Sequence, residues 1–187
     1  MKAVALQAVL ISLLLAPRLC GYVSYPLEFG SRQVGLASAY VATVDNPDIL
    51  FYNPAGLQEL RKINFTLSHG SIFEDSNFEL FSMSYPLETG TVGFGLNYFS
   101  TAPVPEIIDS LATSKALESS SFSINAGYSF ELSRFLNAGI AAKYIKSKLA
   151  DYDASALAFD AGVLLKFETL KYYPRVEPNL RIGASVQ

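Results

Sequence analysis

The chain has 187 residues, of which 50% are hydrophobic, 13% aromatic and 17% charged, and it contains no tryptophan. The charged fraction lies below the roughly 25% of an average soluble protein, and the length suits one domain. A net charge of -3 without clustered lysine and arginine argues against nucleic-acid binding. The 11 tyrosines and 13 phenylalanines favour β-strands.

Residues 1–21 have the features of a secretory signal peptide. Lys2 provides a positive charge, and the apolar stretch over residues 3–16 is too short to span a bilayer as a helix. Cleavage after Gly21 would remove Cys20, the only cysteine, and leave a mature chain that needs no disulfide. Lipidation of Cys20 is the alternative, but Leu19 is larger than the small residue that a lipoprotein signal normally has there.

Residues 30–60 differ from the rest of the chain. A stretch rich in Ala, Ser and Val predicts a short helix over residues 34–42, and the turn sequence Asp-Asn-Pro-Asp follows it. In the next run, Phe-Tyr-Asn-Pro-Ala-Gly-Leu, Pro54 restricts Asn53 to an extended backbone and Gly56 allows a sharp reversal. We therefore expect a compact, apolar segment that is not a strand.

Seven stretches of the remaining chain alternate apolar residues with small or polar ones. A period of two places the two kinds of side chain on opposite faces of a β-strand. No run of apolar residues is long enough for a membrane helix, so a membrane protein of this sequence would span as a barrel. The strands are expected at about residues 63–68, 77–85, 91–98, 121–130, 136–148, 157–167 and 180–187.

The polar face of these strands is unusual for a soluble sheet. It combines serine, asparagine and a few charges with glycine at positions 93, 95, 127, 139, 162 and 183. A soluble sheet would normally expose more lysine, glutamate and threonine. Small and polar residues suit the interior of an outer-membrane barrel, whose apolar face meets lipid and whose aromatic residues gather near the strand ends. A soluble sandwich with its apolar face turned inward is the alternative.

The connections between the strands support a barrel. Residues 86–90 and 131–135 are short turns, whereas residues 101–119 form a long loop with an apolar surface that a ligand or a partner could use. Short periplasmic turns and long external loops are typical of outer-membrane barrels. Because such single-chain barrels have an even number of strands, we expect the chain to be part of a larger barrel. An eighth strand within residues 21–29 is the alternative.

Catalytic and metal-binding motifs are scarce. His69 is the only histidine, and the sequence contains no Gly-x-Ser-x-Gly, P-loop or Gly-x-Gly-x-x-Gly motif. Asp151 and Asp153 provide fewer oxygen ligands than a calcium loop needs, so a solvated loop is the preferred interpretation. We expect no enzymatic activity, no metal and no cofactor.

Three charged residues occupy the polar face of consecutive strands. Lys143, Asp160 and Arg181 are expected to point into the barrel lumen, where they could set an ion preference or hold the N-terminal segment. Packing pairs that only neutralise one another are equally compatible with the pattern.

Several segments resemble the PorV/PorQ family of outer-membrane proteins, which belongs to the FadL-like barrels. They are Phe-Gly-Ser-Arg-Gln-Val-Gly-Leu-Ala-Ser-Ala-Tyr-Val-Ala at 29–42, Asp-Asn-Pro-Asp-Ile-Leu-Phe-Tyr-Asn-Pro-Ala-Gly-Leu at 45–57, Lys-Tyr-Ile at 143–145, Ala-Asp-Tyr-Asp-Ala-Ser at 150–155 and Asn-Leu-Arg-Ile-Gly at 179–183. The resemblance implies that residues 22–60 fold into the lumen as a hatch. Its seating turn would be Asn53, Pro54, Ala55 and Gly56. Family members have about twice as many strands, which again makes this chain an N-terminal portion.

The expected protein is therefore an all-β, antiparallel outer-membrane barrel, with a signal peptide at 1–21, a hatch at 22–60 and barrel strands over 61–187. The resemblance implies a bacterial outer-membrane location and a role in secretion scaffolding or in transport. Its partners would be outer-membrane lipid and either a hydrophobic small molecule or a secreted protein with its secretion machinery. The alternatives are a FadL-like channel for uptake of hydrophobic small molecules and a soluble periplasmic β-sandwich binding protein.

Overall fold

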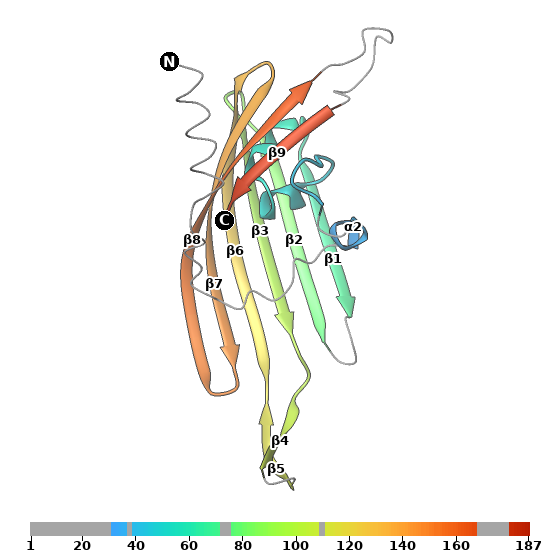
Figure 1. The fold of residues 1–187 in the computed structure, drawn as a ribbon, viewed down its shortest axis with the longest axis vertical. Helices are drawn as coiled ribbons and strands as arrows, with labels where there is room; N and C mark the ends of the chain where they lie inside the picture. The colour runs from blue at the N-terminus through green and yellow to red at the C-terminus, as the bar shows by residue number, and fades with distance from the viewer. Residues whose placement is uncertain (1–30, 37–38, 72–75, 109–110, 168–179) are drawn as a thin grey trace, which may run out of the picture.

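In the computed structural model, the described residues are 31–36, 39–71, 76–108, 111–167 and 180–187. Seven antiparallel strands form one sheet in the order β1-β2-β3-β6-β7-β8-β9, which curls into a half-barrel (Figure 1). Among the described residues there is very little helix. The strands of the sheet are β1 (Asn64–Ser71), β2 (Asn77–Pro86), β3 (Thr91–Ser100), β6 (Ser119–Ser133), β7 (Leu136–Leu149), β8 (Tyr152–Phe167) and β9 (Leu180–Val186).

The antiparallel β-fold expected from the sequence is confirmed, and the sheet strands lie where the alternating pattern predicts them. One connection differs from the prediction. Residues 101–119 do not form an irregular loop, because β4 (Val104–Ile108) and β5 (Leu111–Leu117) pair as a hairpin that projects beyond the sheet (Figure 1). The proposed eighth strand at 21–29 and the signal peptide at 1–21 lie outside the described residues.

Among the described residues, the helices that precede the first strand are α2 (Ser31–Gly35), η1 (Pro47–Phe51) and η2 (Pro54–Glu59), all of them short. The helix predicted over residues 34–42 is misplaced. The observed helix α2 begins at Ser31 and ends at Gly35, and at Tyr40 the described chain is not helical. Glycine, with its high conformational entropy, is a poor helix former and commonly lies where a helix ends.

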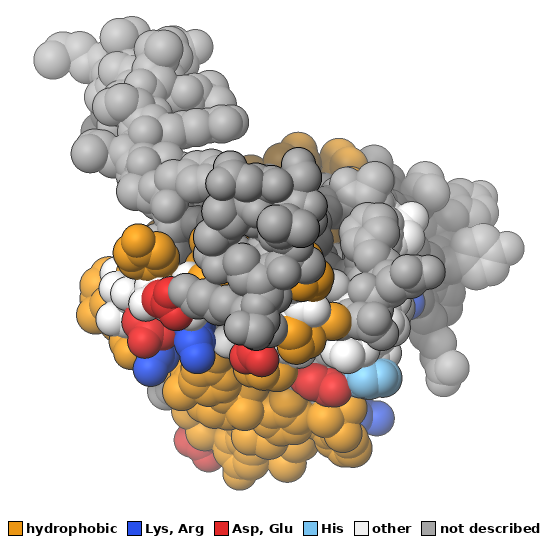
Figure 2. All heavy atoms as spheres, turned by 90° about the horizontal axis from the view of Figure 1, so that it is seen from below, with side chains coloured by type: hydrophobic (Ala, Val, Ile, Leu, Met, Phe, Trp, Pro, Cys, Tyr) orange, Lys and Arg blue, Asp and Glu red, His pale blue; other side chains and the backbone are white. Residues whose placement is uncertain are grey.

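The two faces of the sheet have opposite character. The inner face carries mainly small and polar side chains, many of which are buried, including Ser82, Ser123 and Asn125, together with a few buried apolar ones such as Leu80 and Leu164. The outer face carries large apolar side chains that are exposed: Phe65 by 70%, Phe159 by 71%. Figure 2 shows hydrophobic side chains gathered in a broad area of the surface, with charged side chains along its margin.

Candidate functional site

The described part of residues 31–60, here named the inner segment, lies on the inner face of the sheet. Its helix η1 packs against β1, β2, β3 and β6, and η2 packs against β3, β6, β7 and β8. The apolar residues of this segment supply most of the buried hydrophobic cluster: Tyr40, Ile49, Leu50, Tyr52, Leu57 and Leu60, joined by Ala141 from β7. The hydrophobic core of the half-barrel therefore lies between the segment and the sheet.

Two Asn-Pro pairs explain the local fold of the inner segment. Asn46 caps η1, since its side-chain oxygen accepts a hydrogen bond from the backbone N–H of Asp48. Asn53 caps η2 in the same way through the N–H of Ala55, at 3.1 Å. In both cases the following proline occupies the first turn, where its fixed φ favours a helix and its missing N–H costs nothing.

The inner-face glycines leave room for this segment. A Cβ on Gly139 of β7 would lie 2.4 Å from the backbone of Pro54 and Ala55, and one on Gly162 of β8 would lie 2.0 Å from the side-chain oxygen of Asn53. Gly139 and Gly162 are direct partners in the β7–β8 register. An added Cβ would also meet the inner segment at four other inner-face glycines: Gly93 beside Leu57, Gly95 beside Phe51, Gly127 beside Leu50 and Gly183 beside Val41.

Gly139→Ala should therefore destabilise the protein by about 1–3 kcal/mol, because the added methyl group meets backbone that cannot rotate away. Gly35→Ala is the matched control, since nothing lies within 4 Å of its added Cβ. Urea unfolding of the detergent-solubilised protein, followed by circular dichroism, measures both. If Gly139→Ala left the stability unchanged or raised it, the segment would not occupy this position on the sheet.

The turn expected to seat the segment is fully buried, from Asn53 to Gly56. The amide of Asn53 donates to the carbonyl oxygen of Val163 on β8, at 3.0 Å, and to that of Val41, at 2.9 Å. Pro54 and Ala55 lie over Gly139, whereas Gly56 faces away from these strands and packs against η1 through Ile49. The first three residues thus contact β7 and β8, and Gly56 joins the two short helices.

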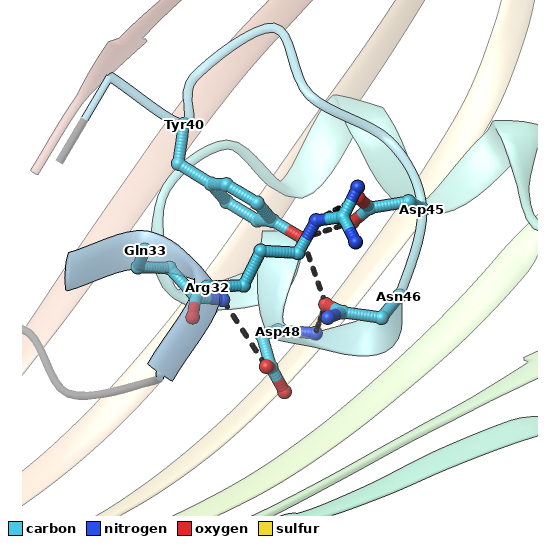
Figure 3. Close-up of polar contacts among 6 residues, drawn as sticks. All are labelled: Arg32, Gln33, Tyr40, Asp45, Asn46 and Asp48. Carbon is cyan, nitrogen blue, oxygen red and sulfur yellow. Dashed lines mark hydrogen bonds and ion pairs between the residues drawn. The ribbon is translucent and has the colours of Figure 1, made fainter. Parts of the chain in front are cut away.

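A polar network fixes the part of the segment that precedes η1 (Figure 3). The hydroxyl of Tyr40 donates to Asp45 and to the side-chain oxygen of Asn46, and Arg32 forms an ion pair with Asp45. Burial, together with the hydrogen bond to Asp45, raises the pKa of Tyr40 well above its ordinary value. Tyr40 therefore remains a neutral hydrogen-bond donor throughout the physiological range.

Asp48 connects this network to the sheet. Its carboxylate accepts hydrogen bonds from Gln33 of α2, at 3.1 Å, and from the hydroxyl of Ser82 on β2. Burial raises the pKa of Asp48, and these two hydrogen bonds offset only part of that effect. The protonated form is thus stabilised in the folded protein relative to the unfolded chain.

A pH dependence follows from this shift. Because the folded pKa of Asp48 lies above 3.8, the folded state binds more protons than the unfolded state at pH values between the unfolded pKa and the folded pKa. The free energy of unfolding should fall as the pH rises from about 4 through the folded pKa, and Asp48→Asn should remove this slope. Urea unfolding at successive pH values tests it, with Asp153→Asn, at an exposed position, as the control. A slope that persists in Asp48→Asn would assign it to another group.

The three charges expected inside the lumen are only partly brought together. Lys143 and Asp160 form an ion pair of 2.9 Å between β7 and β8, and both side chains are largely buried. Arg181 does not join them, because it lies opposite Lys166 in the β8–β9 register. Their contribution to an ion preference stays a prediction.

A second buried ion pair was missed by the sequence reasoning. Lys166 donates to Glu59 of η2, at 2.8 Å, and so does the amide of Asn137 on β7, also at 2.8 Å. Burial alone would raise the pKa of Glu59, but these hydrogen bonds and the charges of Lys166 and Arg181 lower it below its ordinary value. The one signal in the sequence was a lysine on the face of β8 that also carries Asp160 and Gly162.

The outer face has a level boundary. In the strand registers, one apolar residue of each strand lies beside one of the next, in the row Leu67, Phe81, Leu96, Ile124, Tyr144 and Leu157. A second row lies two residues away from the first on each strand, in the same spatial direction on all of them. Its outward positions are His69, Glu79, Tyr98, Phe122, Lys146 and Ser155. The apolar surface therefore meets a boundary of mainly polar and aromatic residues at one height across six strands.

No protein-family model, curated protein or solved structure matches this chain. Within the described residues, no helix has the length and the apolar character needed to cross a membrane. The same part of the chain contains no cluster of three or more histidine, cysteine, aspartate and glutamate residues that could hold a metal ion. The features that bear on function are therefore the two faces of the sheet and the inner segment.

Proposed function

We propose that this chain forms part of an outer-membrane β-barrel of the PorV/PorQ type, exported by its signal peptide and placed with its outer face against lipid. The observation that carries the proposal is the inversion of the sheet: large apolar side chains are exposed, while small polar ones face the inner segment. Outer-membrane barrels have this arrangement. Soluble proteins rarely expose apolar patches larger than about 300–600 Å².

The height of the apolar surface fits a bilayer. On β8 it extends from Leu157 to Phe167, which is a rise of about 33 Å along the strand. A strand tilted by about 45° would cover about 23 Å of membrane thickness over this length, close to the ~25 Å apolar band of such barrels. Outward aromatic residues lie near both ends of the band, for example Tyr144 and Phe167.

The inner segment favours a scaffolding role over open passage. Its apolar cluster fills the inner face at the level of η1 and η2, and Asn53 and Glu59 bond it directly to β7 and β8. Beyond it, the inner face mixes hydroxyl and amide groups such as Ser123 and Asn125 with buried apolar side chains such as Leu80 and Ile145. Because the segment fills the inner face and is bonded to the sheet, a role in protein secretion is preferred to FadL-like uptake.

A heat-modifiability gel on washed outer membranes tests the proposal. We expect the chain in the outer-membrane fraction, with a band whose mobility shifts on boiling. Recovery of the chain in the soluble periplasmic fraction would contradict the proposal. The mass of the boiled band also tells how β1 and β9 are paired, because a strand edge cannot remain open to lipid. A mass well above 20.4 kDa would mean that the same polypeptide supplies further strands, and one near that value would mean that other copies do.

A further inference from the structure

Glu59 ties the inner segment to the sheet at the end of η2. Its Oε1 lies 2.8 Å from Nζ of Lys166 on β8 and 2.8 Å from Nδ2 of Asn137 on β7. The side chains of Glu59 and Lys166 are only 12% and 10% exposed. Hydrogen bonds to buried ionised groups contribute more than neutral ones, and losing one partner leaves the other buried without its counter-charge.

The charges around Glu59 favour its ionised form. Lys166 contacts it directly, and Arg181 on β9, which lies opposite Lys166, adds a second positive charge. On β6, Glu131 is opposite Asn137 in the register, but it is exposed to solvent. The remaining charges on the inner faces of β7 and β8, Lys143 and Asp160, neutralise each other.

The η1 end of the segment is held differently. Its carboxylate, on Asp48, accepts hydrogen bonds from the neutral side chains of Ser82 and Gln33, which have no formal charge to lose. Its apolar residues Leu50 and Phe51 fit over Gly127 and Gly95. A protonated Asp48 can keep hydrogen bonds to both partners, so this contact does not depend on a negative charge.

We propose that the Glu59–Lys166 contact is an ionic latch: loss of the charge on Glu59 frees the η2 end of the segment from β7 and β8, while the η1 end stays seated. The latch adds a conformational device to the proposed barrel. It rests on the contact between segment and sheet, so it does not depend on where the protein is located.

Hydrogen–deuterium exchange of the full-length chain in detergent micelles, at pH 7 and at successive lower pH values, tests the latch. Glu59 has a folded pKa below 4.5, so its contribution is complete above that pH and is lost as the pH falls through the folded pKa. After correction for the chemical exchange rate, amides over 55–60 should open about tenfold more once the pH has fallen below the folded pKa of Glu59, which reflects the loss of a charge-assisted hydrogen bond. The amides of Gly56 and Leu60, both hydrogen-bonded in η2, are the reporters. Those over 49–53 should change less than about twofold, since their contacts keep their partners.

Two variants separate the latch from a general acid effect. Glu59→Gln and Lys166→Met should both show at pH 7 the exchange in η2 that the unsubstituted protein shows only in acid. Glu79→Gln, which removes the exposed carboxylate paired with His69, should keep the original profile. Protection of η2 in Glu59→Gln equal to that of the unsubstituted protein would overturn the proposal, as would equal protection in Lys166→Met. Loss of protection in β6 together with η2 would mean global unfolding and would also overturn it.

Discussion

Asn53→Ala is expected to lower the free energy of unfolding by about 2–4 kcal/mol. The substitution removes a helix cap, which typically contributes about 1 kcal/mol, and it leaves the carbonyl groups of Val41 and Val163 without their shared donor. Because Asn53 is completely buried, water cannot replace the lost amide without opening the structure. The side chain also joins residues 110 positions apart, so its loss weakens the contact between the segment and β8 as well as η2 itself.

Urea unfolding of the detergent-solubilised protein measures this loss against two other variants. Asn64→Ala removes an exposed side-chain bond to Lys62 and should change the stability by less than about 0.5 kcal/mol. Asn53→Ser keeps a capping oxygen but cannot reach Val163, so its effect should lie between those of Asn53→Ala and the original protein. Equal effects of Asn53→Ala and Asn64→Ala would show that Asn53 does not bond the segment to the sheet.

The strands could be predicted because their pattern is local. Alternation with a period of two needs only the neighbouring residues, and the small and polar residues of one face already indicated the interior of a barrel. The inner segment was also recognisable, since Asn-Pro pairs and an apolar run between two turns exclude a strand. The exact positions of its helices could not be predicted, because two short 3₁₀ turns depend on caps and burial more than on helix propensity.

Contacts between distant residues could not be predicted in the same way. Glu59 and Lys166 are 107 residues apart, and Asp48 and Ser82 are 34 apart, so no spacing rule connects them. The pairing of β4 with β5 lies in a stretch that the sequence predicts to be a loop. Pro105 interrupts the alternating pattern there, and the register of the pair shifts next to it. Arg181 was grouped with Lys143 and Asp160 by face alone, although the register places it beside Lys166.

Ile140→Arg is expected to destabilise the membrane-inserted protein by about 2–4 kcal/mol, because Ile140 lies at the centre of the apolar stretch of β7. It points outward and is 60% exposed, with Tyr128 and Ala161 beside it on the neighbouring strands. An arginine there would have to reach a distant headgroup region or carry water into the bilayer. In a soluble protein the same change at an exposed position would alter stability by less than about 0.5 kcal/mol.

Tyr98→Arg is the matched control for this substitution. Tyr98 also points outward and is 44% exposed, but it lies in the boundary row of the outer face, between Glu79 and Phe122. Arginine near a membrane interface costs about 0–1 kcal/mol, so only Ile140→Arg should reduce folding into phospholipid vesicles and the yield in the outer membrane. Equal behaviour of the two variants would mean that the outer face does not meet lipid. A loss confined to Ile140→Arg depends on depth within the apolar surface and not on exposure, which a soluble sheet with an exposed apolar face could not reproduce.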